Sequence, residues 1–122
     1  MKWVKQSIHY WCPDTKEHKF LGQNVTVAIL DTGISPHPDF KDRILSFRDF
    51  SSTTGSSEKV LFSFSHFSPL IDNSGHGTHV AGILAGSGLL SSGTYAGIAP
   101  FCNLIIGKVL DQNGNGSIKN VI

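Results

Sequence analysis

The segment Val25–Leu30, which reads VTVAIL, is a nearly continuous apolar run rich in β-branched residues. Such a run is typical of a strand buried on both faces, as in a parallel sheet that is covered by helices. Leu104–Leu110 has the same character, and Ile44–Phe50 predicts a further short strand. Parallel strands need a long crossover connection, which is usually helical. We therefore expect an α/β fold in which Val25–Leu30 and Leu104–Leu110 are parallel and joined by a right-handed crossover.

The expected crossover helix is Thr78–Gly86, which reads THVAGILAG. Val80, Ile83 and Leu84 fall on one face of this segment at helical spacing. Its two glycines each destabilise a helix by about 1 kcal/mol relative to alanine, so the helix needs a packing reason for them. We expect its glycines and alanines to let the helix backbone approach a neighbour closely.

A histidine framed by glycines stands just before this helix. His76 lies between Gly75 and Gly77 in the segment SGHGTH. Glycine is used where the backbone turns sharply or approaches another group closely. A histidine at a helix start between two glycines is poorly explained as core filling, so His76 is a candidate catalytic residue.

The triplet Asp31–Gly33 (DTG) follows the first apolar run and fits two unrelated protease mechanisms. An aspartic protease pairs two carboxylates about 3 Å apart that share one proton, which predicts an all-β chain and a second triplet or a dimer. In a serine protease, one aspartate orients a histidine, and the histidine takes a proton from a serine. Only the second mechanism also uses His76, the helix and the parallel strands.

Four motifs follow one another in the order Asp31–Ile34, His37–Asp39, Asp72–Gly82 and Gly97–Pro100. Their residues and order resemble the N-terminal half of the catalytic domain of subtilisin-like serine proteases, from about residue 20 to residue 122. The resemblance implies a three-layer α/β fold with a parallel central sheet, incomplete in this chain. It also implies peptide-bond hydrolysis through an Asp-His-Ser triad, of which the chain carries two members, Asp31 and His76.

The resemblance further implies a substrate-binding segment after the last strand. Leu110 would line a pocket near His76, and Gly114, Asn115 and Gly116 would pair with an extended polypeptide substrate through backbone hydrogen bonds. The alternative is an ordinary turn, because Asn-Gly is a strong turn signal.

The sequence predicts no metal ion or other cofactor. His76 and His79, with Asp72 nearby, have a spacing that resembles metal ligands, but the glycine frame is explained without a metal. We expect His79 to be a hydrogen-bonded support residue. Asp39 matches a family position that often helps to bind calcium, whereas the partner loop, Gly86–Tyr95, lacks acidic residues and asparagine. A calcium site is therefore not expected.

The predicted domain organisation is a lead-in segment, residues 1–24, followed by the N-terminal part of a peptidase domain, residues 25–122. No Gly-Thr-Ser nucleophile segment follows the last motif, so the partner expected beyond a polypeptide substrate is the missing C-terminal half of the domain. Ser117 is a plausible N-cap, which predicts a helix that continues past Ile122. The 122-residue chain alone is expected to be inactive. The alternative function is a non-catalytic, peptide-binding pseudo-protease fragment.

Composition excludes several other classes of protein. A hydrophobic share of 39% and a charged share of 16% predict a globular chain, and a net charge of +1 indicates neither a nucleic-acid nor a membrane partner. No apolar run reaches the roughly 20 residues that span a bilayer, and no signal peptide is visible, so we expect a cytoplasmic protein, or a secreted one if a leader was removed.

The cysteines, Cys12 and Cys102, are expected to be free thiols. Val60–Phe67 predicts a half-exposed strand, a hairpin arm or a binding lip.

Overall fold

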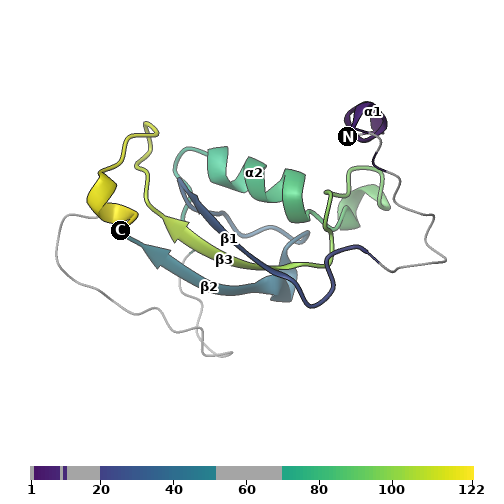
Figure 1. Cartoon of the computed structure of the whole chain (residues 1–122), viewed down its shortest axis with the longest axis horizontal. Helices are drawn as coiled ribbons and strands as arrows, with labels where there is room; N and C mark the ends of the chain where they lie inside the picture. Colours follow the sequence, from purple (N-terminus) through teal and green to yellow (C-terminus); the bar gives the residue numbers. More distant parts are fainter. Residues whose placement is uncertain (1, 9, 11–19, 52–69) are drawn as a thin grey trace.

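Three strands and the helix between two of them form the centre of the computed structural model, which describes residues 2–8, 10, 20–51 and 70–122 (Figure 1). The predicted segment Val60–Phe67 and Cys12 lie outside these residues. The α-helices are α1 (Lys2–Ser7) and α2 (His76–Ala85), and the strands are β1 (Thr26–Asp31), β2 (Ile44–Asp49) and β3 (Asn103–Lys108). Single turns of 3₁₀-helix are η1 (Lys41–Arg43), η2 (Leu89–Ser91) and η3 (Ile118–Asn120).

The strands form one parallel sheet in the order β1-β3-β2. The three predicted strands are confirmed, each with its ends shifted by no more than two residues. In the register of the sheet, Asp31 at the end of β1 lies opposite Lys108 at the end of β3. The carboxyl ends of the strands, the start of α2 and the segment after β3 lie at the same end of the molecule (Figure 1).

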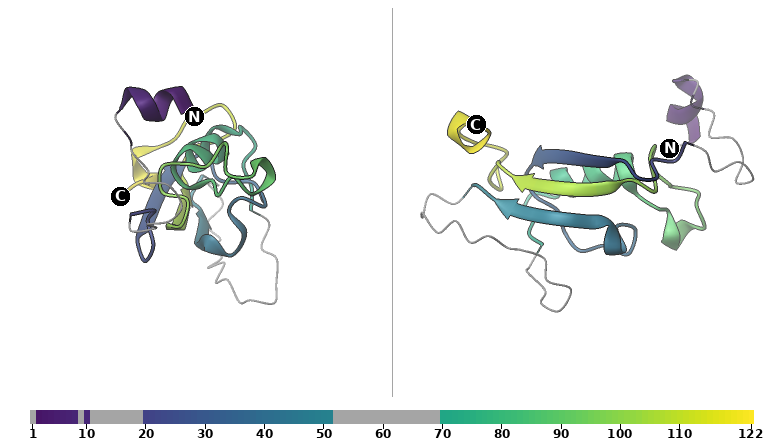
Figure 2. Two further views of the ribbon diagram at one scale, coloured as in Figure 1. Left: turned by 90° about the vertical axis from the view of Figure 1, so that its right-hand side faces the viewer. Right: turned by 60° about the horizontal axis from the view of Figure 1, so that its bottom comes forward.

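The hydrophobic core lies between the sheet and α2, which covers one face of the sheet (Figure 2). The residues that α2 buries are small, Gly77, Ala81 and Ala85, spaced four apart along the helix. Close approach of the helix to the sheet is thus confirmed for the alanines. The prediction is wrong for Gly82, because a Cβ built there meets nothing within 4 Å. Of the apolar side chains expected on one face of α2, Val80 and Leu84 pack against the core, whereas Ile83 is 43% exposed.

Within the described residues the strands are covered on one face only, whereas the apolar runs of β1 and β3 are typical of strands covered on both faces in a complete domain. Leu30, Leu45 and Ile105 are 52%, 49% and 42% exposed, on the sheet face away from α2. The physical reason is that α2 covers one face only, and no described element packs on the other. The sheet face away from α2 is therefore apolar and exposed to solvent.

Two turns, one before β1 and one after β3, are found where the local sequence favours a turn or a helix start. A turn at Gly22–Asn24 leads into β1, and in it the Val25 amide donates to the Gly22 carbonyl at 3.1 Å. Ser117 does cap the following turn, because its Oγ accepts a hydrogen bond from the Lys119 amide at 3.3 Å. That turn is a 3₁₀ turn, η3, rather than the predicted α-helix. No helix among the described residues is long and apolar enough to cross a membrane.

Candidate active site

Asp31 is held at the end of β1 by the neighbouring strand. Its backbone carbonyl accepts hydrogen bonds from the amides of Val109 and Leu110, at 2.9 and 3.2 Å. Its carboxylate oxygen Oδ1 accepts a hydrogen bond from the Thr32 amide at 2.7 Å. The side chain is only 12% exposed, so the carboxylate has a fixed direction.

His76 is the first residue of α2 and points its ring at this carboxylate. The distance from His76 Nδ1 to Asp31 Oδ1 is 2.8 Å. The ring is 63% exposed, and within the described residues Nδ1 is the only ring nitrogen with a hydrogen-bond partner. The hydrogen bond with Asp31, reinforced by the negative charge of that carboxylate, raises the pKa of His76. The sequence prediction that placed these two residues in one site agrees with this geometry.

Two glycines allow this close approach. A Cβ on Gly77 would lie 2.2 Å from the carbonyl oxygen of Gly33, so the first turn of α2 rests directly on the backbone of the Asp-Thr-Gly loop. Gly33 has φ +117°, and a Cβ there would lie 1.9 Å from the carbonyl oxygen of Ile71. No other residue type fits either position without displacing backbone.

Asp72 accepts five hydrogen bonds beside the Asp31–His76 pair. Its Oδ1 accepts from Thr32 Oγ1 at 2.8 Å and from the amides of Ser74 and Gly75 at 3.1 and 2.8 Å. Its Oδ2 accepts from the amide and the hydroxyl of Thr78, at 2.8 and 2.5 Å. Partial burial raises the pKa of the Asp72 carboxyl, but the hydrogen bonds outweigh this effect and hold the pKa far below its usual range. The carboxylate is thus ionised at neutral pH.

A buried lysine joins the aspartate loop to the segment after β3. Lys108 Nζ donates to the carbonyl of Thr32 at 2.7 Å and to that of Leu110 at 3.0 Å. Lys108 is buried, and no carboxylate of the described residues lies within ion-pair distance of it. Its contacts fix Leu110, the first predicted substrate-binding residue, relative to Asp31.

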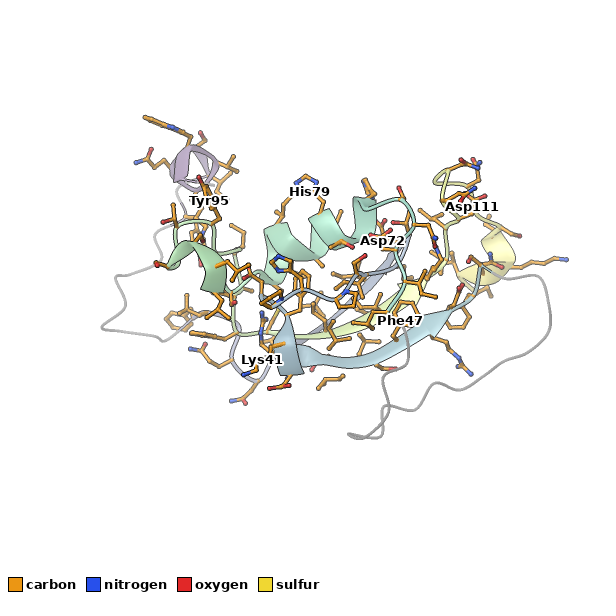
Figure 3. All side chains as sticks on the ribbon, turned by 180° about the vertical axis from the view of Figure 1, so that it is seen from behind. Lys41, Phe47, Asp72, His79, Tyr95 and Asp111 are labelled. Carbon is orange, nitrogen blue, oxygen red and sulfur yellow. The ribbon has the colours of Figure 1, made fainter. Side chains whose placement is uncertain are left out.

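Sequence reasoning missed most of these supporting residues. The sequence places Asp72 in a family motif and near two candidate metal ligands but assigns it no supporting role, although an acidic residue shortly before a helix start is a recognisable capping signal. The roles of Thr32, Thr78 and Lys108 have no signal of that kind. The expected support residue, His79, is exposed, and its ring points away from the sheet (Figure 3). That expectation is wrong because His79 lies on the solvent-facing side of α2.

The predicted substrate-binding residues lie in and next to a compact turn. Asp111 Oδ1 accepts hydrogen bonds from the amides of Asn113 and Asn115, at 2.8 and 2.9 Å. The Gly114 amide donates to the Asp111 carbonyl at 3.1 Å, with Gly114 at φ +78°. Gly116 packs against Leu110, since a Cβ on it would lie 2.7 Å from Leu110 Cδ2. The turn interpretation of this segment therefore holds for its backbone, and its contact with substrate stays a prediction.

The residues of the family's calcium position do not fit a calcium site. The two carboxylate oxygens of Asp39 accept hydrogen bonds from the amides of Gly88 and Leu89, both at 3.0 Å. The loop Gly86–Tyr95 brings no carboxylate of its own. Across the part of the chain that the structure describes, no three histidine, cysteine or acidic side chains form a group that could hold a metal ion. Asp39 holds this loop through its backbone N–H groups instead.

The raised pKa of His76 gives a first prediction. We expect NMR titration of the 122-residue chain to show a His76 pKa above the ordinary histidine value, and Asp31→Asn to lower it. Because the folded-state pKa is raised, the contact with Asp31 stabilises the fold below the pKa of an unfolded histidine. This contribution is lost as the pH rises through the raised pKa of His76. Asp42→Asn, which removes an exposed carboxylate of η1, is the control, and an Asp31→Asn titration equal to wild type would contradict the contact.

Comparisons with known proteins agree with the fold. The family model described as the Subtilase family matches residues 22–122. The chain is 46% identical over 101 residues to the serine protease AprX of Bacillus subtilis, covering 83% of this chain and 20% of that protein. It is 40% identical over 103 residues to the major intracellular serine protease of Bacillus subtilis, covering 83% of this chain and 29% of that protein.

A solved structure with the same fold is that of a cold-adapted subtilisin-like serine proteinase, with a TM-score of 0.59 and 31% identity. The match covers 84% of this chain and 31% of that one, so the chain spans less than a third of these relatives. The parallel α/β sheet contradicts the all-β fold that an aspartic protease requires. The chain has an incomplete subtilisin-like α/β fold, and it belongs to the subtilase family of serine proteases.

Proposed function

We propose that Asp31 and His76 are the aspartate and histidine of an Asp-His-Ser triad in a serine endopeptidase. The observation that carries this proposal is the 2.8 Å contact between Asp31 Oδ1 and His76 Nδ1, which leaves the other ring nitrogen of an exposed imidazole for a nucleophile. The serine itself lies outside residues 1–122 in this proposal. The membership of the chain in a family of serine proteases supports it.

In the proposed reaction His76 acts through Nε2. It removes the proton of the serine hydroxyl as the oxygen attacks the scissile carbonyl, and it later gives that proton to the leaving amine. Asp31 accepts the Nδ1–H hydrogen bond, which keeps Nε2 unprotonated before the attack and stabilises the imidazolium formed during it. The limited exposure of Asp31 and its hydrogen bond from the Thr32 amide support this orienting role.

The proposed substrate is an extended polypeptide that pairs with Gly114, Asn115 and Gly116, while one of its side chains contacts Leu110. Gly116 supports this proposal, because it is exposed and its backbone N–H and C=O make no hydrogen bonds within the described residues. Such free groups are what an added strand needs. The absence of a cofactor, of a nucleic-acid partner and of a membrane partner, and the cytoplasmic location, stay predictions.

A chimeric protease tests this function. Residues 22–122 would replace the matching segment of the relative AprX, which supplies its own serine, to give a protein called here the chimera. We expect the chimera to cleave a chromogenic peptide and to be labelled by a fluorophosphonate. The 122-residue chain alone should do neither, because loss of the nucleophile lowers kcat about 10⁶-fold and each missing oxyanion donor lowers it a further 10²–10³-fold, roughly.

Two results would contradict the proposal. Stoichiometric fluorophosphonate labelling of the 122-residue chain would show a nucleophile within residues 1–122. A folded chimera that binds the peptide and leaves it intact would favour the pseudo-protease alternative. Circular dichroism and the melting temperature of the chimera separate that second result from simple misfolding.

A further inference from the structure

Asp72 and two threonines connect the segment that carries Asp31 to the helix that carries His76. A threonine hydroxyl has one proton to donate, and an ionised carboxylate can only accept. The Thr32 hydroxyl must therefore give its proton to Asp72, and its lone pairs remain for the Gly77 amide, whose nitrogen is 2.9 Å away. The charge on Asp72 thus fixes the direction of the Thr32 hydrogen bonds.

Thr78 repeats this arrangement in the opposite direction. Its hydroxyl donates to Asp72 Oδ2, and its oxygen accepts a hydrogen bond from the Ser35 amide at 3.0 Å. Thr32 follows Asp31 and holds an amide of the helix, whereas Thr78 belongs to the helix and holds an amide of the aspartate loop. Both links involve one carboxylate, because Asp72 accepts the proton of each hydroxyl and so directs the lone pairs of each oxygen toward the amide.

We propose that Asp72 is a positioning residue for the Asp31–His76 pair, and that it acts through the hydroxyls of Thr32 and Thr78. This inference rests on the proposed function of the pair. It goes beyond helix capping, in which Asp72 would serve only the free amides at the start of α2, such as those of Gly75 and Thr78. A cap stabilises α2, whereas the two threonine links set where α2 stands relative to Asp31.

Substitutions at positions 72 and 32 distinguish these roles together. Asparagine keeps the size of aspartate but replaces one accepting oxygen by an NH₂ donor. In either orientation that NH₂ faces a backbone amide of the cap and a threonine hydroxyl, so Asp72→Asn disturbs the cap and one threonine link at once. Thr32→Val leaves the cap amides with Asp72 and removes only the link to the Gly77 amide, so an effect of Thr32→Val on the His76 ring comes from positioning.

The test uses the NMR signal of the hydrogen-bonded Nδ1–H of His76 in the 122-residue chain. Asp31 and Asp72 are the charged groups that act on this ring. We expect Asp72→Asn and Thr32→Val to weaken or abolish this signal, and Thr32→Ser, which keeps the hydroxyl, to retain it. Asp42→Asn is the matched control, since it removes a carboxylate at η1 that makes none of these contacts.

The same variants in the chimera measure the effect on catalysis. Misplacement of a reacting group by about 1 Å can lower the rate about 10²-fold, so we expect kcat to fall 10- to 100-fold in Asp72→Asn and Thr32→Val. KM should change less than kcat, because substrate contacts the segment after β3. Thr32→Ser should restore most of the lost kcat.

The two measurements separate this inference from the proposed function. If the chimera is inactive, the proposed function is contradicted. If the Nδ1–H signal of the 122-residue chain nevertheless responds to Asp72→Asn and Thr32→Val, the coupling of the Asp31–His76 pair to Asp72 is supported. A signal and a kcat that survive both substitutions, with only the melting temperature lowered, would overturn the inference and leave Asp72 as a helix cap. If Asp72→Asn does not fold, loss of the signal in Thr32→Ser would overturn it equally.

Discussion

Replacing His76 by alanine in the chimera should lower kcat about 10⁶-fold. In a Ser-His-Asp triad, loss of the histidine removes almost all that the nucleophile contributes, because the serine is then no longer deprotonated during its attack. The remaining rate would come from substrate binding and the oxyanion site of the relative. Steady-state hydrolysis of a chromogenic peptide, with active-site titration to count competent molecules, measures the loss.

The control for this substitution is the neighbouring histidine of the same helix. His79→Ala removes an imidazole of the same kind from an exposed position, so kcat and KM should change little. KM should also stay within a few-fold of wild type in His76→Ala, since the ring serves the chemical step. An equal loss of kcat in both variants would indicate damage to α2 rather than removal of a general base, and would contradict the assignment.

Replacing Asp31 by asparagine should lower kcat of the chimera about 10⁴-fold. Asparagine fits the space of aspartate, but it neither stabilises the imidazolium nor holds the Nδ1–H tautomer. The pH profile of the residual activity should change as well. The base form of His76 is the neutral ring, so activity rises with pH through the His76 pKa. Because Asp31 raises that pKa, the acid limb should move to lower pH in Asp31→Asn.

Two outcomes would contradict this role of Asp31. A loss of kcat smaller than about tenfold would show that the ring is oriented without Asp31. A large loss with an unchanged acid limb would mean that the pKa of His76 does not depend on this carboxylate. Asp49→Asn, at the end of β2, tests whether removal of any carboxylate at the strand ends has the same effect, and it should not.

The sequence predicted the fold and the proximity of Asp31 and His76, because both depend on local patterns. A strand is visible as an apolar run, and a helix start as a glycine-framed histidine followed by helical spacing. The sharp end of β1 at Asp31 and the beginning of α2 at His76 follow from these patterns within a residue or two. Parallel pairing then follows from the helical crossover, which leaves the two side chains at one end of the sheet.

The supporting residues could not be predicted because their roles arise from contacts between distant segments. Thr32 and Asp72 are forty residues apart, and nothing in either local sequence indicates that one donates to the other. The same is true of Lys108, whose charge lies among backbone carbonyls. Burial of the strands was overestimated for a related reason, since an apolar run shows that a face can be covered and not which element covers it.

The contact between Gly77 and Gly33 has a consequence for how this site can vary. Neither glycine has a side chain, and the backbone of the helix is in contact with the backbone of the loop. No side chain lies between them that could repack to make room for a larger residue. A single methyl group at position 77 would wedge the first turn of α2 outward and carry the His76 ring away from Asp31. The distance between the Asp31 carboxylate and the His76 ring is therefore set by how closely the main chain at Gly77 can approach the main chain at Gly33. In a library that randomises this site, every substitution at Gly33 or Gly77 should disturb the Asp31–His76 contact. Variants with altered activity should therefore carry their substitutions at residues that face the substrate.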